Sequence, residues 1–443
     1  MDELRRTLLP LPEAPIAVGF SGGLDSTVLL HALVASASAR AHGLRAIHVH
    51  HGMHPDADAW AAHCTRVCVD LGVPLSVSRV QVDHAAGRGP EGAARAARLG
   101  AFQSLLRDGE LVALAHHRDD QAETILLRLM RGAGGDGLAA MRRRSRIGEL
   151  HLWRPLLELP RSALHDYATS NALRWIEDPS NADVAYDRNF LRHRVLPSLT
   201  GRWPHAAQNL ARCAALLAEQ SQMLAHVTAQ QLATVQIAPD TLLLPALLAY
   251  AHPQRARILR AWLHRETGSA PSARILAAIE SDLLRARHDS DAHVSWNDRV
   301  LHRWRDRLYT HPETTSLPPD WSAQWDGSAP LRLPNDAILE LRGARAFDFA
   351  VTLRGRAGGE RIRLHGRAHH HALKHVLQVR DVPPWMRKQM PLLYANDGEL
   401  LAAGDSIVSA RMEEWLRSHN AALVWGLEAH PLPTPPPPPR GIG

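Results

Sequence analysis

A chain of 443 residues exceeds the usual size of one domain, so two to four domains are expected. Its hydrophobic fraction of 45% is ordinary for a globular protein. No apolar run approaches the roughly 20 residues that a membrane-spanning helix needs, and the N-terminus lacks a secretory signal pattern. The net charge of +6 permits nucleic-acid binding without proving it, and three cysteines are too few for a disulfide framework. We therefore expect a cytoplasmic protein.

The N-terminal part of the chain alternates short apolar runs with helical patterns. Strands are expected near residues 16–20, 44–51, 73–82 and 111–117, and helices near 25–37, 56–71, 91–106 and 119–131. This alternation predicts an α/β fold with a doubly wound parallel sheet. Ligands of such sheets bind beyond the carboxyl ends of the strands.

The stretch IAVGFSGGLDSTVLL, residues 16–30, joins a strand to a helix through a turn of small residues. This arrangement is typical of phosphate binding, because the N–H groups of a helix N-terminus attract anions. Gly22 and Gly23 lack the Cβ atoms that would obstruct this approach, and Asp25 suits a magnesium ion held on nucleotide phosphates. The spacing differs from the Walker motif, since no Gly-Lys-Ser/Thr follows. An ordinary strand-to-helix connection is the structural alternative.

A second polar segment, HHRDDQAET at residues 116–124, opens the helix that follows the fourth expected strand. Asp120 and Thr124 lie four residues apart and share a helix face. An acidic first turn that complements the helix dipole is the simplest explanation. Because Asp119 and Asp120 follow a strand in the same domain as the glycine-rich turn, magnesium binding is the functional alternative. Both segments are expected to line one crevice.

Three further stretches combine charged and small residues. EGAARAAR places Arg95 on a helix, RGAGGDGLAAM is rich in glycine, and EDPSNADVAYDRNFLR ends at Arg192. Their structural explanations are, in the same order, a solvated helix face, a flexible loop and a loop that caps a helix. Contacts to phosphate and a backbone surface for a substrate are the functional alternatives.

Taken in order, SGGLDS, EGAARAAR, HHRDDQAET, RGAGGDGLAAM, RPLL and EDPSNADVAYDRNFLR resemble the motif series of the tRNA(Ile)-lysidine synthase family. The ordered set spans residues 16–197 and is more specific than any one motif. PQRARILRAWL and WNDRVLHRWRDRLY resemble the helical middle domain of that family, and the region from Glu360 to Gly404 resembles the last domain of its longer members. One departure lies between His371 and His375, where the family often has a lysine-rich string and this chain has only Lys374.

The resemblance implies an adenine nucleotide alpha hydrolase-like fold and an ATP-dependent ligase. Such an enzyme adenylates the C2 oxygen of the wobble cytidine in isoleucine tRNA with a CAU anticodon, and free L-lysine then displaces AMP to give lysidine. The resemblance also implies Mg²⁺, a homodimer and no membrane partner. It assigns ATP binding to Ser21, Gly22, Gly23, Leu24, Asp25 and Ser26, catalysis to Asp25, Asp119, Asp120, Arg95 and Arg192, and the metal to Asp25 and Asp120.

Composition and pattern divide the chain further. We expect a catalytic domain over residues 1–204, a connecting helix over 205–237, a helical tRNA-contacting domain over 238–314 and a linker over 315–330. A small mixed α+β, tRNA-binding domain is expected over 331–428, before a proline-rich disordered tail over 429–443. Candidate contacts of the last domain to tRNA phosphates are Arg361, Arg363, Arg367, Lys374, Arg387 and Lys388.

Three other functions share some of these features. ATP-dependent thiolation of a tRNA base typically needs a cysteine pair, whereas Cys64 and Cys68 lie four apart on one expected helix and no C-x-x-C occurs. An amidating enzyme for a small molecule leaves the C-terminal half unexplained. A non-catalytic RNA-binding protein has no need of an intact SGGLDS or HHRDDQAET.

Overall fold

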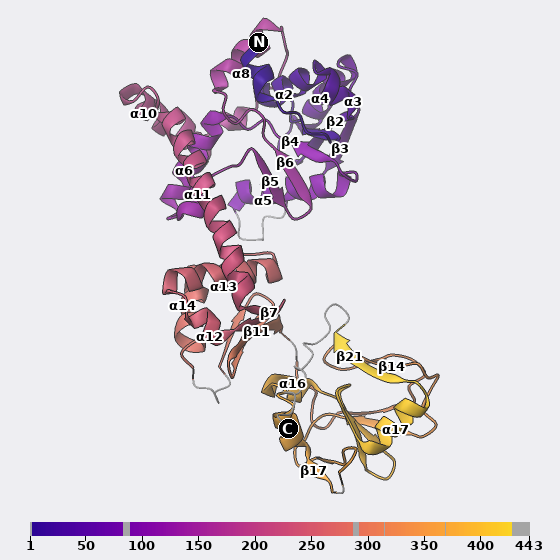
Figure 1. The fold of residues 1–443 in the computed structure, drawn as a ribbon. Coiled ribbons are helices and arrows are strands. Elements are labelled where there is room, and N and C mark those ends of the chain that lie inside the picture. Colours follow the sequence, from indigo (N-terminus) through magenta and orange to yellow (C-terminus); the bar gives the residue numbers. More distant parts are fainter. Residues whose placement is uncertain (1, 83–88, 287–291, 314, 368, 428–443) are drawn as a thin grey trace. The chain divides into compact units, whose positions relative to one another are not determined.

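The computed structural model describes residues 2–82, 89–286, 292–313, 315–367 and 369–427 (Figure 1). The chain divides into two compact units, Met1–Val227 and Thr228–Gly443, and the division falls within helix α11 (Ala206–Val235). None of the helices in the described ranges is both long and apolar enough to cross a membrane. The expected disordered tail over 429–443 lies outside the described residues.

A six-stranded sheet forms the centre of the first unit, in the order β3-β2-β1-β4-β6-β5. Neighbouring strands are parallel except for β5 and β6, which form an antiparallel pair at one edge. The strands are β1 (Ile16–Gly19), β2 (Leu44–His50), β3 (Leu75–Arg79), β4 (Leu111–Ala113), β5 (Arg144–Ile147) and β6 (Leu150–Trp153). The predicted doubly wound parallel sheet is confirmed.

Alternate residues of this sheet enter two different cores. Ile16 and Val18 of β1 pack in a cluster with residues of α2, α4 and α8, whereas Ala17 packs on the other face with Phe102 of α5. Helices therefore cover both faces of the sheet. Successive side chains of a strand point to opposite faces, and a parallel sheet buries both of them. The helices of this unit are α1 (Asp2–Thr7), α2 (Leu24–Val34), α3 (Ala37–Ala41), α4 (Ala57–Asp70), α5 (Gly89–Leu105), α6 (Arg118–Met130), α7 (Gly135–Leu138), α8 (Arg161–Ser170), α9 (Asp187–Phe190) and α10 (Leu196–Arg202).

The second unit begins with helices packed on an antiparallel sheet. The sheet has the order β7-β8-β11-β10-β9, and its core includes Trp262 and Leu301, which are fully buried. Its elements are β7 (Gln236–Ala238), β8 (Thr241–Leu243), α12 (Leu244–Leu248), α13 (His252–Thr267), α14 (Ala273–Ala278), β9 (His293–Trp296), β10 (Arg299–Trp304) and β11 (Arg307–Pro312).

The rest of the second unit is a mixed α+β fold around one core. It contains sheets in the orders β12-β15-β18-β19-β20, β13-β14-β21 and β16-β17. Its elements are β12 (Ser322–Trp325), β13 (Leu331–Arg332), β14 (Ala337–Arg342), β15 (Val351–Arg354), β16 (Arg361–Ile362), β17 (His371–Ala372), α15 (Leu373–Val379), α16 (Pro384–Gln389), β18 (Leu392–Ala395), β19 (Leu400–Ala403), β20 (Ile407–Val408), α17 (Ala410–Ser418) and β21 (Ala422–Leu427).

The segment expected as a linker, residues 315–330, belongs to this fold instead. Its strand β12 pairs with β15 along its whole length, and Leu317 and Trp325 are buried in the core. Prolines and polar residues dominate the composition of the segment, but Leu317, Trp321 and Trp325 are spaced four apart and pack against the core. Burial of these three side chains decides the structure.

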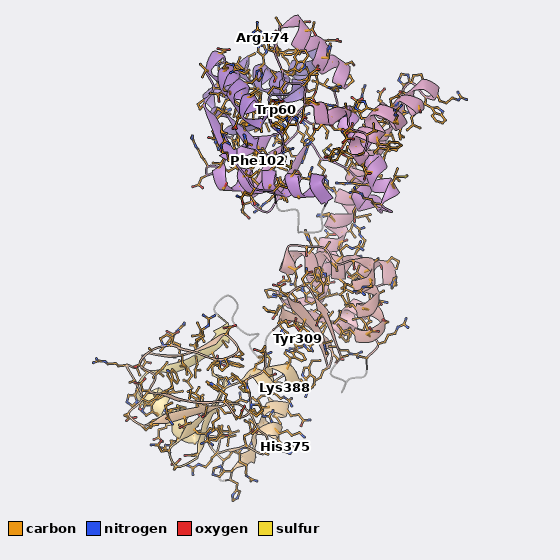
Figure 2. All side chains as sticks on the ribbon, turned by 180° about the vertical axis from the view of Figure 1, so that it is seen from behind. Trp60, Phe102, Arg174, Tyr309, His375 and Lys388 are labelled. Atoms are coloured by element: carbon orange, nitrogen blue, oxygen red, sulfur yellow. The ribbon has the colours of Figure 1, made fainter. Side chains whose placement is uncertain are left out.

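One tryptophan connects the two sheet systems of the second unit. Trp385 of α16 stacks on His302 of β10, with ring centroids 4.1 Å apart, and meets the edge of Tyr309 of β11 at 5.5 Å. Next to this stack, Trp304 Nε1 donates a hydrogen bond of 3.1 Å to Asp381 Oδ1. Tyr309 and Lys388, the latter also on α16, are labelled in Figure 2.

Candidate active site

The glycine-rich turn links β1 to α2 and is held by its own side chains. Ser26 Oγ donates to the carbonyl of Gly23 at 3.1 Å and accepts from the N–H of Ser21 at 3.3 Å. Gly22 has a φ of 82°, and a Cβ there would lie 2.7 Å from Ile176 Cδ1. No side-chain cap covers the start of α2 in the described structure. The first N–H groups of α2 are therefore left for water or an anion.

The segment HHRDD reaches the same place because β4 lies next to β1. His117 is 1% exposed, and its Nε2 lies 3.6 Å from Asp25 Oδ2 and 3.5 Å from Asp120 Oδ2. Burial alone would lower the pKa of His117, but the carboxylates of Asp119, Asp25 and Asp120 raise it to about 10. The two predicted segments thus meet at the ends of neighbouring strands.

The two adjacent aspartates differ in their surroundings. Asp119 Oδ2 accepts a hydrogen bond of 2.8 Å from the N–H of Arg161, at the start of α8. Burial would raise the pKa of Asp119, yet its hydrogen bonds from His117 and Arg161 lower that pKa to about 2. Asp120 Oδ2 accepts from the N–H of His117 at 3.0 Å, which caps α6. Asp119 is thus directed at α8, whereas Asp120 faces the cluster around His117.

Arg192 approaches from a π-helical turn, Leu191–Val195. Its Nη2 lies 3.2 Å from Asp120 Oδ1, and its Nε lies 2.7 Å from Glu123 Oε1. Glu123 is fully buried, and its second oxygen, Oε2, has no hydrogen-bond partner among the described residues. Burial raises the pKa of Glu123, and this effect exceeds the opposing effect of Arg192.

Four of the five predicted catalytic residues therefore gather in one cluster: Asp25, Asp119, Asp120 and Arg192. The fifth, Arg95, is an exposed residue of α5 whose charge acts on His116, Arg128 and Arg154.

Sequence reasoning assigned no role to two members of the cluster, His117 and Glu123. Both lie in the HHRDDQAET segment, and Glu123 follows Asp120 by three residues, so it shares a helix face with that aspartate. That spacing is a signal for Glu123. The burial of both side chains has no such signal, because it depends on Asp25 and Arg192 from distant parts of the chain.

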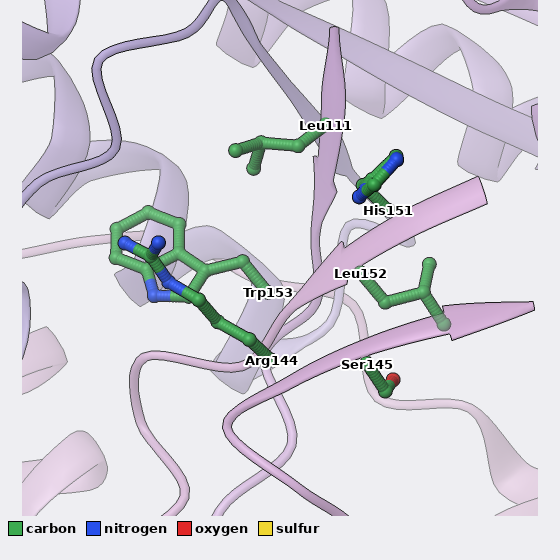
Figure 3. Close-up of a pocket in the computed structure, with 6 residues that line it drawn as sticks. All are labelled: Leu111, Arg144, Ser145, His151, Leu152 and Trp153. Atoms are coloured by element: carbon green, nitrogen blue, oxygen red, sulfur yellow. The ribbon is translucent and has the colours of Figure 1, made fainter. Parts of the chain in front are cut away.

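A pocket of about 290 Å³ lies elsewhere in the first unit (Figure 3). Its lining comes from β4, β5 and β6, namely Leu111, Arg144, Ser145, His151, Leu152 and Trp153. It contains none of the predicted site residues, so we assign it no part in the chemistry.

Three protein-family models match successive parts of the chain. They are the PP-loop domain over residues 2–199, the TilS substrate binding domain over 242–309 and the TilS substrate C-terminal domain over 351–425. The first match covers the sheet, the glycine-rich turn and the whole carboxylate cluster. Family comparison therefore supports ATP use by this unit.

Curated relatives with the name tRNA(Ile)-lysidine synthase match over nearly the full length. The tRNA(Ile)-lysidine synthase of Xanthomonas campestris pv. campestris (strain 8004) is 49% identical over 416 residues, covering 94% of this chain and 95% of the relative. That of Escherichia coli O157:H7 is 40% identical over 423 residues, covering 94% and 97%. Among solved structures, a U34-tRNA thiolase from Methanococcus maripaludis with its [4Fe-4S] cluster aligns with 49% of this chain and 78% of the thiolase chain. The two chains are 18% identical in sequence and the TM-score is 0.43, so this similarity carries no functional argument. The chain belongs to the tRNA(Ile)-lysidine synthase family and is an enzyme of that type.

Proposed function

We propose that this chain attaches free L-lysine to C2 of the wobble cytidine in isoleucine tRNA bearing a CAU anticodon. In the first step the C2 oxygen attacks the α-phosphorus of ATP and pyrophosphate leaves. In the second step the ε-nitrogen of lysine forms a bond to C2, the C2–O bond breaks, AMP leaves and the nitrogen loses a proton. The observation that carries the proposal is the meeting of Asp25, from the glycine-rich turn, with His117 and Asp120 at the ends of β1 and β4.

The turn from Ser21 to Ser26 supports the first step. Its backbone N–H groups and the start of α2 suit the negative charge that grows on a departing pyrophosphate. Gly22 lets the turn take this shape, because its φ is positive and a Cβ there would collide with the side chains of Ile176 and Cys64. The predicted ATP set, Ser21, Gly22, Gly23, Leu24, Asp25 and Ser26, is continuous along this surface.

The residues present fit a magnesium ion. The described ranges contain no group of three or more histidine, cysteine or acidic side chains placed to hold a metal. Mg²⁺ on a nucleotide usually takes only one or two carboxylates, with phosphate oxygens and water as the other ligands. Asp25 Oδ1 is buried and lacks a hydrogen-bond partner among the described residues, so it is suited to this role. Asp25 and Asp120 would hold the ion, which neutralises phosphate charge when bound.

The carboxylates of α6 support the second step. A protonated lysine must shed a proton before its nitrogen attacks, so it needs an acceptor inside the site. Glu123 has one oxygen on Arg192 and one buried oxygen without a partner among the described residues, and its pKa is raised. We assign this proton to Glu123. Asp120 has two alternative roles, to hold the ion or to orient the ammonium. Asp119, which binds the start of α8, acts as a positioning residue.

The remaining assignments concern partners. The two TilS domains of the second unit favour contacts to tRNA outside the anticodon. The homodimer and the cytoplasmic location that the resemblance implies stay predictions.

Mass analysis of isoleucine tRNA tests the function. After incubation with the protein, ATP and lysine, the wobble cytidine should gain one lysine minus water, and the gain should vanish when lysine is omitted. Exchange of oxygen for sulfur at that base, or pyrophosphate release without any change in the tRNA, would overturn the proposal.

A further inference from the structure

Arg95, Arg154 and Arg188 act electrostatically on His116, which lies just beyond β4, and Arg128 acts on Arg154. Arg95 comes from α5, Arg128 from α6, Arg154 follows β6 and Arg188 lies on α9. Burial lowers the pKa of His116 to about 3; the carboxylate of Asp120 opposes this effect, and the charges of Arg154, Arg188 and Arg95 add to it. Burial also lowers the pKa of Arg154 to about 10, and the charges of Arg95 and Arg128 add to that effect. Arg128 and Arg154 thus each lie near enough to Arg95 for their charges to repel.

Arg154 is the most deeply buried member. It is 3% exposed, and its Nη1 donates to the carbonyl of Arg142 at 2.9 Å and to Ser145 Oγ at 2.8 Å. Both acceptors are uncharged. Its Nε is buried without a partner among the described residues, and so is Nδ1 of His116. Buried cations are normally paired with an anion, so this guanidinium lacks the counter-charge that its burial calls for.

The cluster is open toward solvent at its other end. Arg95 is exposed, and Arg128 and Arg188 are half-buried. Arg188 Nη2 lies 3.4 Å from Thr124 Oγ1, and Arg128 follows Thr124 by four residues on the same face of α6. Arg128 also donates to the carbonyls of Gly137 and Ala140, which fixes the glycine-rich segment at 132–140. The cations thus extend from the exposed Arg95 to the buried Arg154.

The position of the cluster relates it to the chemistry. Asp120, Thr124 and Arg128 lie at successive turns of α6, and at about 1.5 Å per residue the carboxylate end and the cation end are roughly 12 Å apart along the axis. The glycine-rich turn and Asp25 lie at the carboxylate end. His116 precedes His117, which contacts Asp25 and Asp120, so the buried part of the cluster borders the site of adenylation.

We propose that Arg95, Arg128, Arg154 and Arg188 form a second oxyanion site, which holds a backbone phosphate of the tRNA beside the reacting cytidine. This rests on the proposed function, because it takes the RNA to be the substrate. Planar guanidiniums bind phosphate through paired N–H donors, and a fixed phosphate next to the wobble nucleotide positions its base at the turn. The role of Arg154 is positioning, since it holds the substrate without touching the reacting atoms.

Arg154→Gln tests the proposal in the full-length protein. We expect tRNA affinity to fall by about tenfold to a hundredfold, the effect of removing one hydrogen bond to a charged group. The slope of log affinity against log salt should flatten by about 0.7 to 0.9, as for one phosphate contact. The KM values for ATP and for lysine should stay unchanged. Arg146→Gln is the matched control, because Arg146 lies on β5 of the same hairpin, is exposed and pairs with Glu149. It should leave all of these quantities unchanged.

Two further variants keep the test decisive if Arg154→Gln fails to fold. Arg154→Lys retains a charge without the planar fork, and should keep the salt slope while losing part of the affinity. Arg95→Gln alters an exposed residue and should reduce the slope by the same amount as Arg154→Gln. An unchanged salt slope in both Arg154→Gln and Arg95→Gln overturns the proposal.

The kinetic constants separate the sources of the oxyanion. A rise in the KM for ATP alone would assign the site to ATP or pyrophosphate, and a rise in the KM for lysine alone would assign it to the lysine carboxylate. Either result overturns the tRNA assignment. Wild-type lysidine formation is measured separately, so failure of the function itself is distinguishable from failure of this site.

Discussion

Glu123→Gln separates the chemical role of the buried carboxylate from a structural one. The carboxylate of Glu123 is fully buried, and its pKa is raised by that burial. A carboxyl whose folded pKa lies above the unfolded value stabilises the fold below the unfolded pKa, and this stability is lost as pH rises through the folded pKa. Above the unfolded pKa, burial of an ionised Glu123 therefore costs folding free energy. A neutral amide of the same shape removes that cost.

The opposing effect is the weaker bond to Arg192. The contact of 2.7 Å between Arg192 Nε and Glu123 Oε1 changes from a fully charged pair to a bond with a neutral acceptor, a loss of about 1 kcal/mol. Since the two effects oppose each other, the free energy of unfolding should change by less than about 1 kcal/mol, or about 2–4 °C in Tm for a unit of this size. Loss of the proton acceptor, in contrast, should slow the transfer of lysine by about 10²–10⁴-fold.

The assay follows the two chemical steps separately. Pyrophosphate release in the first turnover should stay near the wild-type rate in Glu123→Gln, while an adenylated tRNA accumulates and lysidine formation slows. Lysine transfer at the wild-type rate in a folded variant would refute the assignment. A large drop in Tm would show instead that the ion pair with Arg192 mainly stabilises the fold.

Other substitutions test the remaining parts of the site. Asp25→Ala should keep the fold and lose at least about 10²-fold in pyrophosphate release, since charge stabilisation at the turn is lost, and near-normal release would remove Asp25 from the site. Asp120→Asn should reduce lysidine formation. Accumulation of adenylated tRNA would indicate that Asp120 orients lysine, whereas loss of adenylation would indicate that Asp120 holds the metal. Wild-type rates in both steps would exclude both roles. Gly22→Ala should weaken ATP binding and lower Tm, because Gly22 has a φ of 82° and a Cβ would lie 2.9 Å from Cys64 Sγ; an unchanged ATP affinity would contradict the proposed phosphate surface.

The first unit was predictable because its signals are local. Strand-helix alternation gives the parallel sheet, and a ligand site at the carboxyl ends of strands follows from that topology. SGGLDS and HHRDD each follow a strand directly, so the meeting of Asp25 and Asp120 at His117 needs only the adjacency of β1 and β4. The residues of the site thus came from short motifs and one topological rule.

The features that sequence reasoning missed depend on contacts between distant segments. Glu123 becomes unusual only because Arg192, 69 residues later, pairs with one of its oxygens. Arg154 is the first residue of the RPLL motif, and nothing in that motif indicates that its side chain is buried near the charges of Arg95 and Arg128. The segment expected as a linker, residues 315–330, folds for the same reason, since its strand β12 is defined by its pairing with β15. Long-range burial and pairing have no periodic pattern in the sequence.

The last prediction concerns the second unit. Removal of residues 316–443 should weaken tRNA binding and flatten its salt dependence, while ATP binding by the first unit survives, since phosphate contacts release counterions and the ATP turn lies elsewhere. This deletion also removes Trp385 from its stack on His302, so it uncovers a buried ring.

A control without that defect is therefore needed, and Lys374→Gln with Lys388→Gln in the full-length chain provides it. Both lysines are exposed on α15 and α16, so their replacement leaves the core intact (Figure 2 labels Lys388). If each lysine binds one phosphate, each substitution should reduce the salt slope by about 0.7 to 0.9. If the double variant and the truncated protein both keep the wild-type slope and affinity, residues 316–443 only support the fold. The choice between two tRNAs with one anticodon must then be made by the rest of the chain.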